Sequence, residues 1–103
     1  MNIDNFKKVL NQIKEYPHQW NQEMWHHEST HCFGGWCQIF HTGIQDQYGV
    51  RTDTMAYLNI SEVETNWLVD ALRTLVDFDN FLKEEGIPIK TPVIYGKYTN
   101  RRL

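Results

Sequence analysis

Residues 26–31 carry the side chains best suited to chemistry in this chain. His27, Glu28 and His31 fit the H-E-x-x-H pattern of zinc peptidases, in which two histidines bind the metal and the glutamate acts as general base. The match continues into a longer form of the pattern, with Gly34 at the expected glycine and Cys37 where a third histidine would stand. This spacing raises the hypothesis of a small zinc-dependent hydrolase.

The surrounding residues favour another interpretation of the motif. Zinc binding needs His27, Glu28 and His31 on one face of a helix, whereas Ser29 and Thr30 are preferred N-caps and predict that a helix begins there. Only 26 residues precede the first motif histidine, too few to build the sheet that lines such a peptidase cleft. We interpret the match as accidental, and we expect no catalytic residue and no cofactor.

Two other chemical hypotheses use the neighbouring cysteines. Cys37 and His41 stand four residues apart on an expected helix and could share a zinc ion with His27 or His31. Their alternative roles are a small core side chain for Cys37 and a favourable cation at a helix C-terminus for His41. Cys32 could act as a nucleophile in the first helical turn, with one of these histidines as its base, but buried cysteines are more often inert.

The C-terminal tail has the opposite charge to the rest of the chain. Residues 87–103 hold four basic residues and no acid, hence +4, and because the whole chain carries −3, residues 1–86 carry −7. An acidic body does not suggest duplex nucleic acid, but a basic tail with tyrosines could bind a small anion such as a nucleotide. The tail residues that offer stacking faces or phosphate donors are Tyr95, Lys97, Tyr98, Arg101 and Arg102. The alternative is that the tail docks on its own acidic body or on a neighbouring subunit.

A second candidate surface lies in the polar connection before the cysteines. Trp20, Trp25 and His27 stand there among glutamines and asparagines. Tryptophans in such a segment either contact a ligand or cover the core, and covering the core is the better interpretation for both.

The apolar pattern predicts an all-α fold, a compact bundle of four to five short helices. Apolar residues recur at helical spacing in several segments that end at Pro17, Gly43 or Gly86. Ser61 with Glu64 and Thr74 with Asp77 form the S/T-x-x-E/D pattern that opens a helix. The expected helices and their core residues are 3–16 (Ile3, Phe6, Leu10, Ile13), 30–42 (Phe33, Trp36, Cys37, Phe40), 51–60 (Met55, Tyr57, Leu58), 62–72 (Val63, Trp67, Leu68, Ala71) and 75–85 (Leu75, Phe78, Phe81, Leu82).

Two glycines interrupt the second expected helix. Gly34 and Gly35 each cost about 1 kcal/mol relative to alanine in a helix interior. We therefore expect another helix to approach closely at this point, beside Trp36.

Length and composition indicate a single globular domain. The chain has 103 residues, 41% hydrophobic, and no apolar run approaches the length of a membrane span. We expect residues 1–86 to form one helical domain and 87–103 an extended tail with a short strand around 92–98, which would need a partner strand from this domain or from a second copy. Two cysteines and no apolar leader favour a cytoplasmic protein with reduced thiols.

Part of the chain resembles a known group of proteins. Trp20, Trp25, THCFGGWCQI at 30–39 and YLNISEVETNWLVDALRTLVDFDNFL at 57–82 are similar to small uncharacterised bacterial and phage proteins, well represented in cyanobacteria. The group shares a pattern of roughly T-x-H-C-x-A-G-W, then L-x-L-x-x-x-E-A-x-x-L-F and R-T-x-x-D. This chain departs from it with Gly34 for alanine, Val69 for an aromatic residue and its own basic tail. The pattern does not include the first histidine or the glutamate of H-E-x-x-H, and it implies no activity.

Three classes of function remain from the sequence. The first, which we favour, is a non-catalytic, homo-oligomeric binding protein. It would be a phage-type inhibitor or counter-defence protein that sequesters a nucleotide-like ligand or a host protein. The second is the zinc-dependent hydrolase, and the third is a self-assembling structural protein.

Overall fold

Five short helices form most of the computed structural model, which describes residues 1–88. They are α1 (Ile3–Glu15), α2 (Phe33–Thr42), α3 (Val50–Leu58), α4 (Glu62–Val69) and α5 (Leu75–Glu84). Two 3-10 turns, η1 (Pro17–Gln19) and η2 (Gln47–Gly49), and an antiparallel hairpin, β1 (His26–His27) with β2 (Thr30–His31), complete the fold. The prediction of a mostly helical bundle is confirmed for these residues, whereas the hairpin was not predicted.

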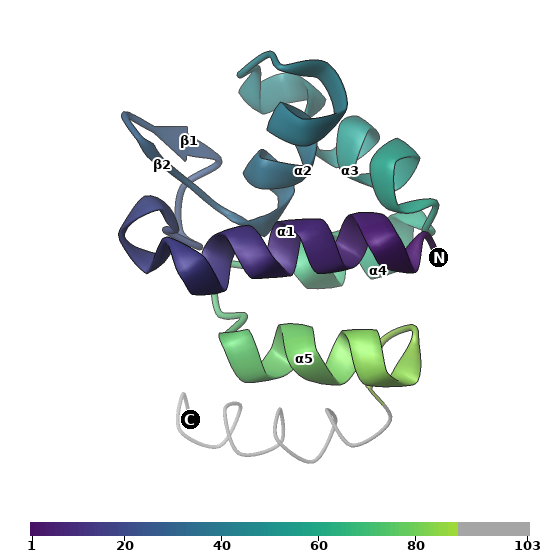
Figure 1. Ribbon diagram of the computed structural model, residues 1–103. Coiled ribbons are helices and arrows are strands. Elements are labelled where there is room, and N and C mark those ends of the chain that lie inside the picture. Colours follow the sequence, from purple (N-terminus) through teal and green to yellow (C-terminus); the bar gives the residue numbers. More distant parts are fainter. Residues whose placement is uncertain (89–103) are drawn as a thin grey trace, which may run out of the picture.

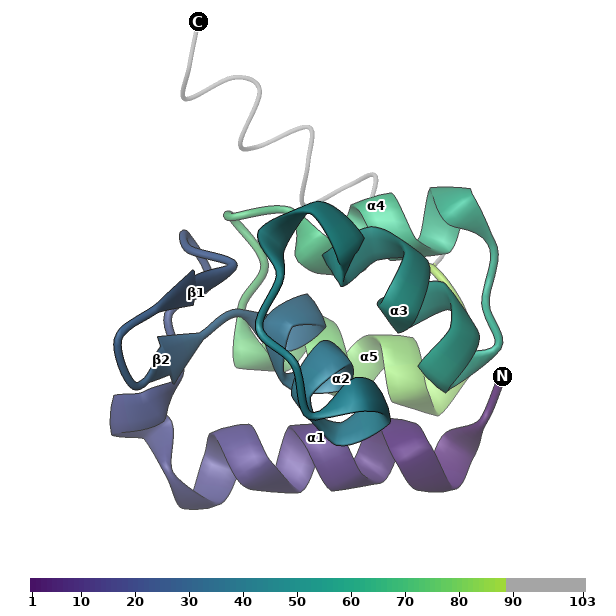
Figure 2. The same ribbon diagram turned by 90° about the horizontal axis from the view of Figure 1, so that it is seen from above.

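The core forms around α2, which is buried along its first six residues. Helix α1 crosses one side of the molecule, α5 runs antiparallel to it on the next layer, and α2 lies between α1 and the pair α3 and α4 (Figures 1 and 2). Phe33 at the start of α2 meets Phe6 of α1 at 4.9 Å and Phe78 of α5 at 4.5 Å between ring centroids. These aromatic contacts join residues far apart in the sequence into one core.

Several helix ends follow the local signals of the sequence. Both predicted capping boxes are present, Ser61 with Glu64 and Thr74 with Asp77. Gly43 ends α2 in the left-handed conformation with φ of 74°. Helix α5 ends at Glu84, close to the predicted stop at Gly86, and its C-cap Glu85 adopts the left-handed conformation.

The predicted start of the second helix is wrong. The helix begins at Phe33, and its N-cap is Cys32, whose Sγ accepts a hydrogen bond from the Gly35 N–H at 3.2 Å. Ser29 and Thr30 lie instead in the hairpin, where the Thr30 hydroxyl donates to the His27 carbonyl at 2.8 Å. The Thr30 hydroxyl therefore bonds within the hairpin and does not cap a helix.

Helix α4 ends at Val69, three residues before the predicted end. The Gln22 amide donates to the carbonyls of Leu68 and Asp70, both at 2.9 Å, and the Arg73 Nε–H donates to the Trp67 carbonyl at 2.7 Å. In a longer helix these carbonyls would accept hydrogen bonds from the backbone N–H groups of the next turn. Here the side chains of Gln22 and Arg73 occupy them, and the helix ends.

Two residues assigned to the core stripe of this helix lie outside the core. Val63 is 68% exposed and Ala71 is exposed as well. Trp67 and Leu68 are buried as predicted.

The glycine pair of α2 allows two close approaches. A Cβ at Gly34 would lie 2.7 Å from Val69 Cγ1 and 2.9 Å from Val50 Cγ1, which confirms the expected contact with helices. A Cβ at Gly35 would instead collide with the Trp25 carbonyl oxygen of the segment that leads into the hairpin. The backbone directly before the hairpin therefore packs against the backbone of α2 at Gly35.

The end of the described chain packs on the domain. Ile87 lies against the core and Pro88 is buried. The predicted strand and the tail ligand residues, Tyr95, Lys97, Tyr98, Arg101 and Arg102, lie outside the described residues. Among the helices of residues 1–88, none combines the length and apolar character that a membrane span requires.

Candidate functional site

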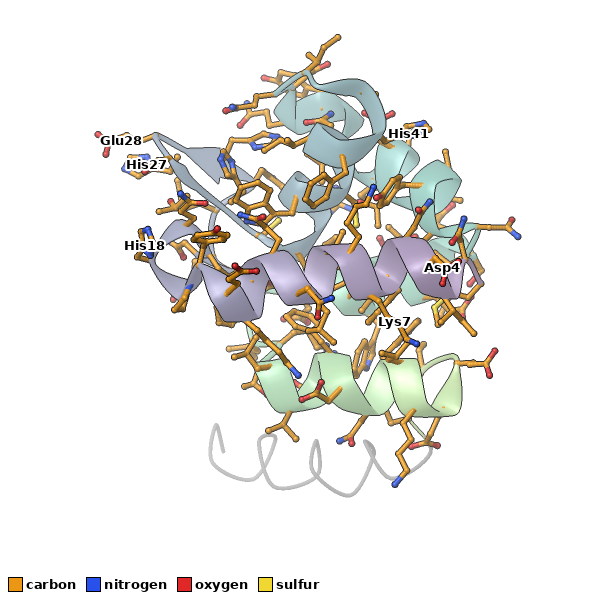
Figure 3. The ribbon with its side chains drawn as sticks, viewed as in Figure 1. Asp4, Lys7, His18, His27, Glu28 and His41 are labelled. Carbon is orange, nitrogen blue, oxygen red and sulfur yellow. The ribbon has the colours of Figure 1, made fainter. Side chains whose placement is uncertain are left out.

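The residues of the H-E-x-x-H motif do not share a face. His27 and Glu28 stand at the exposed turn of the hairpin, where Glu28 has a positive φ of 55° (Figure 3). In the register of the hairpin, His27 pairs with Thr30, and His31 pairs with His26 on the other face. His27 therefore points to solvent, whereas His31 is buried, with 4% of its surface exposed. The helical face that a zinc peptidase requires is not formed here.

The other proposed zinc ligands are also separated. Cys37 is fully buried in α2, and His41 is exposed at the C-terminal end of that helix, on the opposite side of the molecule from His27 (Figure 3). Within residues 1–88, no three His, Cys, Asp or Glu side chains are grouped so that they could hold a metal ion.

Both thiols lie in surroundings that disfavour the thiolate. Burial raises the pKa of Cys32, and the N–H groups of Gly34 and Gly35 offset this only in part. Complete burial raises the pKa of Cys37 well above its ordinary value, and the nearby Cys32 adds to the effect. A nucleophilic cysteine needs the opposite shift, so the helix start at Cys32 does not provide an activated thiol.

The two candidate tryptophans take different positions. Trp20 is half-buried with its ring edge-on to Phe78, 6.0 Å between centroids, and its indole N–H donates to Gln22 at 3.0 Å. Trp25 is half-buried before the hairpin, and the Arg51 guanidinium lies 4.9 Å above its ring. Trp20 covers the core as expected, while Trp25 forms a surface contact with α3.

The largest network of polar side chains in the described residues was not predicted from the sequence motifs. We call it the Gln38 cluster, and its members come from the hairpin, α2, the α2–α3 loop (residues 43–49) and α3. The members are His26, His31, Gln38, Asp46 and Asp53.

Gln38 is the centre of this cluster and is 1% exposed. Its Oε1 accepts from the Asp46 N–H at 2.9 Å and bonds to His26 Nε2 at 2.6 Å. Its Nε2 donates to the Asp46 carbonyl at 2.8 Å and to Asp53 Oδ2 at 2.9 Å. All four hydrogen-bonding positions of the buried amide are used, so Gln38 ties the hairpin, the α2–α3 loop and α3 to one point.

A histidine pair forms the hairpin side of the cluster. The Nδ1 atoms of His26 and His31 lie 2.8 Å apart, and the His31 ring packs edge-on against Trp36 at 4.8 Å. Burial lowers the pKa of His31, and the neighbouring His26 lowers it further. The sequence contains one signal for this cluster. Because α2 is apolar around nearly its whole circumference, a polar residue within it, such as Gln38, is expected to be buried.

The Gln38 cluster fixes a surface loop with two exposed apolar side chains. Ile44 is 62% exposed and Tyr48 is 89% exposed, both in the α2–α3 loop. The two hydrogen bonds between the Gln38 side-chain amide and the Asp46 backbone hold this loop in place. Within the loop, the Asp46 carboxylate accepts a hydrogen bond from the Tyr48 N–H at 3.1 Å. A buried side chain thus sets the backbone that presents Tyr48.

No protein-family model, curated protein sequence or solved structure matches this chain. The resemblance to the small bacterial and phage group stays a prediction.

Proposed function

We propose that this chain is a non-catalytic interaction protein and that the α2–α3 loop is its contact surface. The observation that carries the proposal is Tyr48, which is 89% exposed on a backbone that Gln38 holds from within the core. An aromatic side chain supplies a large contact area with little rotamer freedom to lose, and a loop held in place loses little entropy on binding. Tyr48 and Ile44 together suit insertion into a pocket on a partner protein.

The placement of the chemically active side chains supports a function without catalysis. His27 and Glu28 lie on a solvent-facing turn, and the thiols of Cys32 and Cys37 are buried with raised pKa values. A host protein is the partner class that the resemblance to phage proteins suggests. In that case the chain would act by occupying a surface of its target.

The test is affinity capture from a bacterial extract with two matched double variants. Ile44→Ser with Tyr48→Ser removes the proposed contact, and Val63→Ser with Val76→Ser removes apolar side chains that are 68% and 63% exposed elsewhere. Because all four residues are exposed, both variants are expected to keep the wild-type circular dichroism spectrum. A partner lost only by the first variant supports the proposal, and equal capture by both variants contradicts it.

A second candidate function uses the basic tail. Tyr95 and Tyr98 offer stacking faces, and Lys97, Arg101 and Arg102 offer donors for a phosphate, which suits a small nucleotide-like anion. Native mass spectrometry of the full chain reports subunit number, bound metal and any organic ligand together. Arg101→Ala with Arg102→Ala should abolish ligand binding and leave the subunit number unchanged. Loss of assembly instead would identify the tail as an assembly arm, and one zinc per chain would favour the hydrolase.

A further inference from the structure

Hydrogen bonds to Gln38 determine where one proton of the histidine pair resides. The Asp46 N–H must donate to Gln38 Oε1 and the Asp46 carbonyl must accept from Gln38 Nε2, so the orientation of the amide is fixed. Gln38 Oε1 can only accept, and His26 Nε2 lies 2.6 Å from it. His26 Nε2 therefore carries a proton in every state in which this bond is present.

The contact between the two rings limits the number of further protons. The Nδ1 atoms of His26 and His31 are 2.8 Å apart, a hydrogen-bond distance that requires one donor and one acceptor. One proton thus lies between the rings, and a further proton can be added only at His31 Nε2. With four protons, both rings would be cations and would point N–H groups at each other.

We propose that the β1–β2 hairpin is released by protons: it is docked on α2 while the histidine pair carries at most one positive charge, and it detaches when both rings are protonated. The inference rests on the hydrogen-bond geometry and is independent of the proposed interaction surface. Detachment would break the His26–Gln38 bond and uncover Trp36, against which His31 packs.

Charged groups of both signs lie near the pair. Asp53 and the Asp46 carbonyl accept hydrogen bonds from Gln38, which in turn bonds to His26, so their negative charge and dipole favour a positive charge on the histidine pair. Arg51 lies above the Trp25 ring, and its positive charge opposes a positive charge on the pair. The other titratable groups on the packed elements are the neutral thiols of Cys32 and Cys37 on α2, the exposed His41 at the end of that helix, the Asp46 carboxylate of the α2–α3 loop, the exposed His18 of η1, and the solvent-facing His27 and Glu28 of the hairpin turn.

The direction of the pH effect follows from proton counting. A free histidine titrates near a pKa of about 6.5, so below that pH each of the two rings adds one proton to its neutral form when the hairpin is detached. The docked pair can add no more than one proton to its neutral form, and burial with the adjacent His26 lowers the pKa of His31. Docking is therefore complete above about pH 6.5 and weakens as pH falls, with the opening constant rising about tenfold or more per pH unit.

Amide hydrogen exchange of the wild-type chain at pH 5 and pH 7 tests the proposal directly. The Cys32 N–H donates to the Met24 carbonyl at 3.0 Å and the Asn21 N–H donates to the His31 carbonyl at 3.1 Å, so both report on hairpin docking. Their protection, relative to the amides of Leu10 and Ile13 in α1, should fall at least about tenfold at the lower pH. An unchanged ratio would overturn the proposal.

Two asparagine variants assign the effect to the pair. In His31→Asn the side-chain amide takes the place of the imidazole Nδ1, and it can donate or accept without adding a charge. This variant should lose the pH dependence of hairpin protection, whereas His27→Asn, on the other face of the hairpin, should keep it. If His31→Asn keeps the dependence, or His27→Asn loses it, the pair is not the proton sensor. If His31→Asn fails to fold, the wild-type exchange ratio alone decides.

Discussion

Replacing Gln38 with methionine would remove the central amide of the cluster and keep the length of the side chain. The variant loses four hydrogen bonds, to His26, to Asp53, and to the N–H and carbonyl of Asp46. Because methionine is flexible and similar in volume, it should fill the buried site without leaving a cavity. The free-energy change then reports on the hydrogen bonds and hardly on packing.

The expected loss of stability is about 2–3 kcal/mol, less than the about 4 kcal/mol that four bonds at about 1 kcal/mol each would suggest. The reduction reflects the exposure of Asp46 and the partial exposure of Asp53, which can bond to water when the amide is removed. Since a small domain is stable by about 5–15 kcal/mol, the variant should still fold. Its melting temperature should fall by about 10–20 °C.

Urea denaturation followed by tryptophan fluorescence measures this difference. Gln45→Met is the matched control, because Gln45 is exposed in the loop that Gln38 holds, and it should change stability by less than about 0.5 kcal/mol. If the free energies of unfolding of Gln38→Met and Gln45→Met differ by less than about 0.5 kcal/mol, the Gln38 cluster does not hold the hairpin and the loop in place.

Two further predictions concern the start of α2. Gly35→Ala should destabilise the chain by about 1–3 kcal/mol, because its methyl group would collide with the Trp25 carbonyl, whereas Gly86→Ala meets only the flexible end of a glutamate and should be nearly neutral. Equal losses in urea denaturation would contradict the backbone contact between Trp25 and α2. At pH 7.5 a maleimide should modify Cys32 and Cys37 at least about tenfold more slowly in the folded chain than in urea, since both are buried with raised pKa values. Modification at the unfolded rate would argue that α2 opens readily.

Helix positions were predictable where the signal lies within one turn. A capping box joins Ser61 to Glu64 or Thr74 to Asp77 over three residues, and Gly43 ends α2 through its own backbone conformation. Such interactions join residues within a single turn, so the sequence pattern can indicate them without knowledge of the tertiary contacts. The core phenylalanines were predictable for the same reason, because helical spacing gathers them on one face.

The end of α4 depended on residues far away in the sequence. Gln22, which donates to Leu68 and Asp70, stands 46 and 48 residues from them. No local pattern distinguishes a carbonyl that will meet such a side chain from one that will not, so the helix was predicted to continue.

The candidate site likewise combines features that the sequence predicts with contacts that only the tertiary structure sets. The types and spacing of His27, Glu28 and His31 suggested a metal site, but the zinc geometry exists only if the backbone there is helical, and the hairpin turns His27 away from His31. The sequence by itself determined the helices, their caps and much of the aromatic core, because these follow from interactions between near neighbours. Only the tertiary structure decided that His26, Gln38 and Asp53 meet, because a buried polar group takes its partners from whichever segments the packing brings within hydrogen-bond distance.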